Sequence, residues 1–135
     1  MNEFIDLLPG QELHTEPGRS IIGQCGSLIS RVLYIKNGSN TFFAIIDAGM
    51  TDLIRPALYQ AYHKIENLTS TGKIYRYDVV GPVCESADTF AKYIELPETS
   101  RGDIIAIRSA GAYGEAMASR YNLRDLAKSV FSDEI

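Results

Sequence analysis

The chain has 135 residues, of which 45% are hydrophobic and 22% charged, a balance typical of a globular protein with one domain. Its net charge of −4 argues against nucleic-acid binding, which requires clustered lysine and arginine. Apolar runs such as Phe42 to Ile46 are far shorter than the ~20 residues of a membrane-spanning helix, and the first residues, Met1 to Asp6, lack the basic start of a leader sequence.

Short strands and one helical region are predicted in the first half of the chain. Ser27 to Ile35 and Thr41 to Asp47 are rich in β-branched and aromatic residues, and the Asn-Gly-containing loop between them predicts a hairpin. Thr51 to Lys64 has apolar residues at helical spacing. Pro56 is expected to interrupt a regular helix there, which leaves short or irregular helical pieces.

Three more strands are predicted at Ile74 to Val80, Thr89 to Leu96 and Asp103 to Ser109, bounded by Gly-Pro, Leu-Pro and Arg-Gly-Asp. Ala110 to Arg124 fits either a bulged strand or helical turns, and the tail from Leu126 is expected to fray. Strands at this spacing favour an all-β fold with minor helix over a parallel α/β sheet. We expect a small Greek-key-like barrel or sandwich.

The segment Glu16-Pro17-Gly18-Arg19 is the first candidate for ligand binding. Pro17 fixes one backbone angle and Gly18 permits a tight bend, so Glu16 and Arg19 would lie close together. Backbone amides at such a bend, beside a guanidinium, make a cradle for an anion. An ordinary surface turn with a solvated arginine is the alternative.

Arg55, Tyr59 and Tyr113 are further candidates. A spacing of four residues places Arg55 and Tyr59 on one face of a helical turn, where a guanidinium could hold a carboxylate while the phenol donates alongside. The alternative is an arginine stem packed over a core tyrosine. Tyr113 stands between Gly111 and Gly114, where bare backbone would let a ligand approach its hydroxyl; alternatively it caps one end of a barrel.

Cys84 and Glu85 follow an apolar, strand-like run at a turn. A thiol beside a carboxylate suits proton delivery and recognition of a positively charged amine. The alternative is a small buried cysteine next to a surface charge.

The two cysteines form no disulfide framework. We expect Cys25 and Cys84 to be reduced thiols in a cytoplasmic protein, with a bridge between them as the alternative. Neither has ligand-like spacing to His14 or His63, so no structural zinc is predicted.

Four ordered motifs resemble the C-terminal region of the diaminopimelate decarboxylases, pyridoxal-phosphate enzymes of the alanine-racemase-like fold type that act in the last step of lysine biosynthesis. The motifs are His14-Thr-Glu-Pro-Gly-Arg-Ser20, Asp47 to Tyr59, Gly81-Pro-Val-Cys-Glu-Ser86 and Gly111-Ala-Tyr-Gly114, with Arg101-Gly-Asp103 and Tyr121-Asn122 in the same order. The resemblance extends from about Gly10 to Arg124 and implies a C-terminal β-barrel.

The resemblance implies a cofactor contact at two places. Glu16 to Arg19 would contact the phosphate of pyridoxal 5′-phosphate, and Arg19 would also reach the substrate carboxylate. Tyr113 would touch both the substrate and the cofactor. The cofactor supplies the electron sink for the reaction.

The resemblance also implies substrate contacts. Arg55 and Tyr59 would hold the distal carboxylate of meso-2,6-diaminopimelate, and Glu85 would bind its distal ammonium. Cys84 would return a proton to the substrate after carbon dioxide has left. Cys84 and Glu85 would serve the active site of the partner subunit, which implies a homodimer.

The family carries its cofactor-binding lysine in an N-terminal (β/α)₈ barrel, which has no counterpart in this chain. The five lysines present lie in turns, on strand-like runs with polar neighbours or near the tail, and such settings do not activate an amine. They are Lys36, Lys64, Lys73, Lys92 and Lys128. We therefore expect residues 1–135 to be a single C-terminal domain that is inactive alone.

Two other interpretations remain. A barrel of this ancestry could be a non-catalytic module for oligomerisation or ligand binding. The chain could also be part of an arginine or ornithine decarboxylase, although ornithine has no distal carboxylate for Arg55 and Tyr59 to bind.

Overall fold

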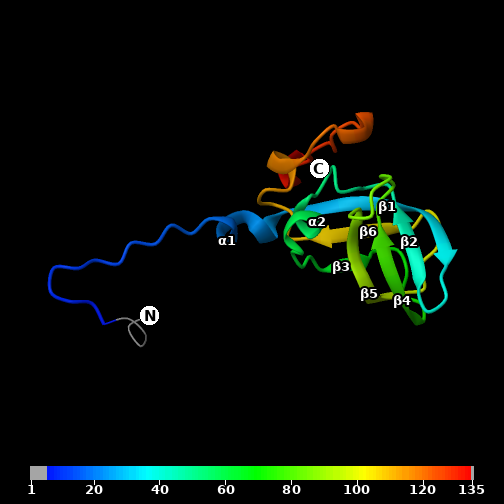
Figure 1. Cartoon of the computed structure of the whole chain (residues 1–135), viewed down its shortest axis with the longest axis horizontal. Coiled ribbons are helices and arrows are strands. Elements are labelled where there is room, and N and C mark those ends of the chain that lie inside the picture. Colours follow the sequence, from blue (N-terminus) through cyan, green and yellow to red (C-terminus); the bar gives the residue numbers. More distant parts are fainter. Residues whose placement is uncertain (1–5, 135) are drawn as a thin grey trace.

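The computed structural model describes residues 6–134, and a six-stranded sheet forms its body (Figure 1). The expectation of no leader sequence rests on residues 1–6, most of which lie outside this range. The strands are β1 (Ser27–Asn37), β2 (Phe42–Ile46), β3 (Ile65–Asn67), β4 (Ile74–Val80), β5 (Thr89–Pro97) and β6 (Ile104–Arg108). Within residues 6–134, none of the helices has the length and hydrophobicity of a transmembrane segment.

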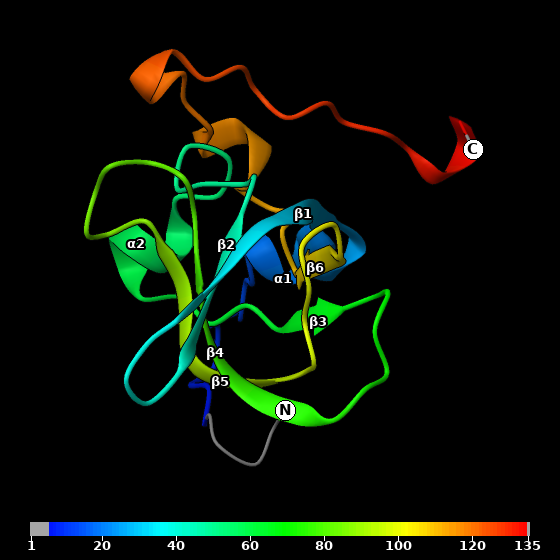
Figure 2. The same cartoon turned by 90° about the vertical axis from the view of Figure 1, so that its right-hand side faces the viewer.

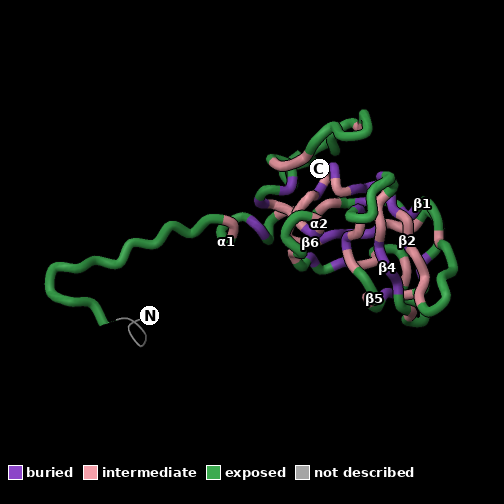
Figure 3. The backbone as a smooth tube through the Cα atoms, in the orientation of Figure 1, coloured by how far each residue is buried: buried purple, intermediate pink, exposed green. Residues whose placement is uncertain are grey.

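The helical elements are short. The α-helices are α1 (Arg19–Ile22) and α2 (Arg55–Tyr59), and the 3₁₀ turns are η1 (Gly23–Cys25), η2 (Glu115–Met117), η3 (Tyr121–Leu123) and η4 (Ser132–Glu134). Residues 6–18 form an extended, exposed arm that leads away from the body (Figures 1 and 3).

The strand order is β3-β6-β1-β2-β4-β5, and every neighbouring pair is antiparallel except the parallel pair β2 and β4. The edge strands β3 and β5 come into contact, so the sheet curls into a nearly closed barrel (Figure 2). The prediction of an all-β barrel with minor helix is confirmed. The parallel pair was not foreseen, because β2 and β4 are joined by a long connection that contains α2 and β3.

Strand β1 joins the two halves of the sheet. Its first part pairs with β6, where Ser27 lies opposite Arg108, and its second part pairs with β2, where Asn37 lies opposite Phe42. The register shifts between Val32 and Tyr34, at the point where β1 passes from one partner to the other. The predicted hairpin is therefore present as β1 and β2.

The core lies inside the curled sheet (Figure 3). Apolar side chains from all six strands and from the loop before α2 fill it, and each fully buried one contributes roughly 1.5–3 kcal/mol. The largest fully buried side chains are Val32, Ile46, Leu53, Val79, Leu96, Ile105 and Ile107.

The structure corrects the predicted role of Pro56 and resolves one ambiguity. A short helical piece is present as predicted, but Pro56 does not interrupt it: Pro56 lies in the first turn of α2, where its missing N–H is not needed. The helix ends at Tyr59, and the residue after it, Gln60, has a left-handed φ of 53°. The stretch from Ala110 to Arg124 forms the turns η2 and η3, not a bulged strand. Strand β3 was missed.

Candidate functional site

The glycine turn after β6 packs against the backbone of η1. The Gly111 N–H donates to the carbonyl of Gly23 at 3.1 Å, and the Ala110 N–H donates to the carbonyl of Gly26 at 2.9 Å. A Cβ atom on Gly111 would overlap the carbonyl oxygen of Ile22, so only glycine fits there. The space beside the Gly111 backbone, where a ligand was expected, is thus occupied by the backbone of η1. This contact places α1 beside the turn.

Arg19 begins α1 and reaches the end of β6. Its Nη2 donates to the carbonyl oxygen of Ser109 at 3.1 Å, while its buried Nε has no hydrogen-bond partner among the described residues. A Cβ built on Gly18 would lie 3.7 Å from the hydroxyl of Tyr113, so Gly18 and Tyr113 are neighbours.

The expected bend at Pro17 and Gly18 is not present. Residues 11–18 form no turn, Glu16 and Pro17 are exposed, and no hydrogen bond or ion pair joins Glu16 to Arg19 among the described residues. The Pro-Gly pair is followed directly by α1, with Gly18 as the residue that precedes the helix. Of this motif, Gly18 and Arg19 reach the site, and Glu16 and Pro17 remain on the exposed arm.

Arg55 lies between two tyrosine rings. Its Cζ atom is 5.3 Å from the ring centroid of Tyr59 and 5.8 Å from that of Tyr113. These three residues and Met117 line an open cavity of about 390 Å³. Tyr59 is 57% exposed, so it is not the core tyrosine of the alternative interpretation. The cavity presents a cation and two phenols, which suits a carboxylate.

A buried histidine lies close enough to Arg19 and Arg55 to sense their charges. His63 is 3% exposed, and its Nδ1 is 2.9 Å from the carbonyl oxygen of Arg108. Burial lowers the pKa of His63, and the charges of Arg19 and Arg55 lower it further. The imidazole is therefore held neutral beside two guanidiniums.

Three buried nitrogen atoms near the end of β6 have no hydrogen-bond partner among the described residues: Nε of Arg19, Nε of Arg55 and Nε2 of His63. The two guanidinium groups give this region a positive potential that an anion would compensate. Sequence reasoning considered His63 only as a metal ligand. The signal in the sequence that could have placed His63 at this site is its position shortly after Arg55 and Tyr59.

Cys84 and Glu85 lie in the loop between β4 and β5, and both are exposed. A buried cysteine, the alternative interpretation, is therefore wrong, and Cys25 is likewise an exposed free thiol. Neither Cys84 nor Glu85 lines the cavity at Arg55. The hydroxyl of Tyr121 donates to Oε1 of Glu85 at 2.5 Å, and this hydrogen bond raises the pKa of Tyr121.

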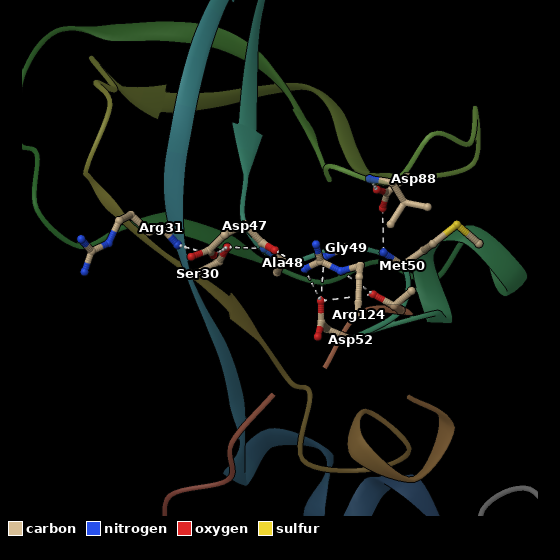
Figure 4. Close-up of polar contacts among 11 residues, drawn as sticks. Ser30, Arg31, Asp47, Ala48, Gly49, Met50, Asp52, Asp88 and Arg124 are labelled. Carbon is tan, nitrogen blue, oxygen red and sulfur yellow. Dashed lines mark hydrogen bonds and ion pairs between the residues drawn. The ribbon is translucent and has the colours of Figure 1, made fainter. Parts of the chain in front are cut away.

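A buried carboxylate holds the loop of Cys84 and Glu85 in place. Asp88 is 3% exposed and accepts the N–H groups of Val83 and Met50, both at 2.6 Å (Figure 4). It therefore joins this loop to the loop that precedes α2. Burial raises the pKa of Asp88. A Cβ on Gly81 would overlap this carboxylate, so glycine is required there.

The loop from Asp47 to Asp52 also binds the C-terminal segment. Arg124 donates from Nη2 to the carbonyl of Asp47 at 2.5 Å and from Nε to the hydroxyl of Thr51 at 3.2 Å, and its guanidinium lies 3.6 Å from the carboxylate of Asp52 (Figure 4). The same loop is also attached to β1, because the hydroxyl of Ser30 donates to the Asp47 carboxylate. Neither Asp88 nor Arg124 was identified from the sequence.

A family model described as "Pyridoxal-dependent decarboxylase, C-terminal sheet domain" matches residues 19–111. The chain belongs to this family. The match covers the barrel, α1 and the first residue of the Gly111 turn, so it contains Arg19, Arg55, Tyr59, Cys84 and Glu85.

Individual relatives support the same assignment. A diaminopimelate decarboxylase of Bacteroides thetaiotaomicron is 64% identical over 97% of this chain and 34% of its own length. One from Helicobacter pylori is 55% identical over 81% of this chain and 27% of its own length. The chain thus spans about a third or less of the curated relatives it matches.

Solved structures share the fold. A Helicobacter pylori diaminopimelate decarboxylase complexed with L-lysine has a TM-score of 0.74 and 56% identity, over 79% of this chain and 26% of that one. A Vibrio vulnificus lysine/ornithine decarboxylase complexed with cadaverine has a TM-score of 0.75 at 26% identity, over 83% of this chain and 30% of that one.

Proposed function

We propose that residues 1–135 form the single C-terminal, substrate-binding domain of a diaminopimelate decarboxylase, which converts meso-2,6-diaminopimelate to L-lysine and carbon dioxide. The observation that carries this proposal is the cavity in which the Arg55 guanidinium lies between Tyr59 and Tyr113. The names of the relatives, at up to 64% identity, support the substrate.

Pyridoxal 5′-phosphate is the proposed cofactor, and the residues present fit its phosphate. The buried Nε of Arg19 has no partner among the described residues, and the Tyr113 hydroxyl lies beside the backbone of Gly18. Glu16 and Pro17, on the exposed arm, would border this position. When bound, the cofactor supplies the electron sink that decarboxylation needs, and its lysine partner would come from outside this chain.

The substrate is recognised through its distal end. Arg55 and Tyr59, helped by Arg19, would bind the distal carboxylate, because a guanidinium and a phenol together satisfy both of its oxygens. Ornithine and arginine have no carboxylate at this end and would leave Arg55 unpaired. The cavity therefore favours a diamino diacid over the alternative substrates.

Cys84 and Glu85 are proposed to act across a homodimer. Glu85 would accept the distal ammonium, and the exposed thiol of Cys84 would return a proton to the carbon that has lost carbon dioxide. Neither residue lines the cavity at Arg55, which supports a role in the site of the partner subunit. Two free thiols also support a cytoplasmic location, where reducing conditions prevail.

A chimera tests this function. The chain replaces the matching segment of the Bacteroides thetaiotaomicron relative, and carbon dioxide release from meso-diaminopimelate is measured, with ornithine and arginine as competing substrates. We expect turnover within about tenfold of the parent enzyme and a strong preference for the diamino diacid. A folded, cofactor-loaded chimera without turnover would support the non-catalytic module instead, and a preference for ornithine or arginine would support the related decarboxylases.

A further inference from the structure

We propose that Tyr121 is a positioning residue for Glu85 and that it increases the preference of the enzyme for a substrate with a distal ammonium. This inference rests on the proposed function and assigns a role to a residue outside the cavity at Arg55.

The contact itself leaves half of the carboxylate free. The hydroxyl of Tyr121 donates to Oε1 of Glu85 at 2.5 Å, and no other hydrogen bond to this carboxylate is present among residues 6–134. A phenol has one hydrogen to donate, so Oε2 stays available for an ammonium group. Both side chains are exposed, and two exposed side chains keep one geometry only if their backbones are held.

The backbone of Glu85 is held from within its own loop. Its N–H donates to the carbonyl of Val83 at 2.8 Å, and its carbonyl accepts the N–H of Asp88 at 3.0 Å. The Asp88 carboxylate accepts the Val83 N–H and ties the loop to Met50. Glu85 therefore projects from a fixed turn.

The backbone of Tyr121 is held by the loop that Asp88 also contacts. The N–H of Ser119 donates to the carbonyl of Thr51 at 2.9 Å, and Arg124 donates to the Thr51 hydroxyl and to the Asp47 carbonyl. Tyr121 lies between these two anchors. Asp88 and Arg124 thus attach the Glu85 loop and the Tyr121 segment to one common loop (Figure 4).

The conformation between Tyr121 and Arg124 is unfavourable by itself. Asn122 and Leu123 have φ values of 56° and 57°, in the left-handed region that a leucine rarely adopts. The side chain of Leu123 is 98% exposed, so its packing does not stabilise this conformation. The contacts of Arg124 and Tyr121 maintain it, as expected where a backbone is strained to place a functional group.

The consequence is selectivity for a charged amine. Because Tyr121 already orients the Glu85 carboxylate, this side chain loses less conformational entropy when one of its oxygens binds an ammonium group. A substrate without the distal amine gains nothing from this arrangement. Loss of the Tyr121 hydroxyl should therefore weaken the binding of the ligand that carries the distal amine. The binding of a ligand without this amine should not change.

The test compares Tyr121→Phe with the unaltered chimera, using meso-diaminopimelate as substrate and 2-aminopimelate, which lacks the distal amine, as a competing ligand. We expect the KM for meso-diaminopimelate to rise about three- to tenfold with kcat changed less than twofold, because the lost contact is made in the ground state and the transition state alike. The inhibition constant of 2-aminopimelate should not change. Tyr34→Phe is the control, since Tyr34 is 58% exposed on β1 and its hydroxyl has no partner among the described residues.

An equal effect on both ligands, or no change in KM, would overturn the inference while leaving the proposed function intact. If the unaltered chimera does not turn over meso-diaminopimelate, the proposed function fails, and the contact is tested in this chain by ultraviolet titration of tyrosine. There Glu85→Gln should lower the pKa of Tyr121 toward its ordinary value, identified by comparison with Tyr121→Phe. An unchanged titration would show that the hydrogen bond is absent and would refute the inference.

Discussion

Single side chains give the proposed site its charge. The Cζ atom of Arg55 lies within about 6 Å of the ring centroids of Tyr59 and Tyr113, so two cation–π contacts hold the position of its guanidinium. Arg19 is fixed differently, by the Ser109 carbonyl. The imidazole of His63 is buried near them, and its lowered pKa keeps it from adding a third positive charge.

Replacing Arg55 by lysine should impair substrate binding although the charge is kept. Lysine cannot form two parallel hydrogen bonds with a carboxylate and stacks less well on tyrosine, so we expect the KM of the chimera for meso-diaminopimelate to rise at least about tenfold. Arg31→Lys, on the exposed face of β1, is the control and should leave KM unchanged. Equal KM values for both variants would exclude Arg55 from the substrate site.

His63 should make stability dependent on pH. Its pKa in the folded chain is lowered from 6.5, so below pH 6.5 the unfolded chain binds a proton that the folded chain does not bind. The free energy of unfolding contributed by His63 is therefore present above pH 6.5 and falls as the pH drops below it. His63→Gln should flatten this dependence in urea denaturation between neutral and mildly acidic pH, whereas His14→Gln should not. The same slope in His63→Gln and the unaltered chain would disprove this.

At the scale of elements, two loops and the C-terminal segment form one unit. The Cys84 loop, the loop from Asp47 to Asp52 and the segment around Arg124 are joined by side-chain to backbone hydrogen bonds. Because Asp88 uses both carboxylate oxygens for these bonds, its substitution should affect more than one loop.

Asp88→Asn should destabilise the chain by about 1–3 kcal/mol, because the amide nitrogen of asparagine would face a backbone N–H and leave it unpaired. Asp78→Asn is the matched control. Asp78 is also buried, but it accepts one N–H, that of Tyr93, which asparagine can still bond through its oxygen. Urea denaturation should show the larger loss for Asp88→Asn, and equal losses would contradict the account.

Local signals made part of this structure predictable. The β1–β2 hairpin follows from its Asn-Gly loop, and the pairing of Arg55 with Tyr59 follows from helical spacing, since both depend on near neighbours in the sequence. Strand β3 has three residues and becomes a strand by pairing with β6, a contact distant in sequence. The links made by Asp88 and Arg124 are also distant, so no short pattern indicates them.

Across the whole molecule, the side chains proposed to act in the active site fall into two separate sets. One is the cavity around Arg55, and the other is the loop with Cys84 and Glu85. If each set serves a different active site of a homodimer, every site needs residues from two chains. The proposed function requires this division of residues between two chains.

Complementation between two inactive chimeras tests it most directly. Cys84→Ala removes the proton donor, Arg55→Gln removes the carboxylate contact, and the two variants are dissociated, mixed and reassociated. In a heterodimer, one site contains both altered residues and the other contains neither, so carbon dioxide release should recover to about a quarter of the unaltered level, since half of the dimers are mixed and each has one intact site. If heterodimers isolated through a tag on one variant remained inactive, the two sets of residues would not serve different active sites.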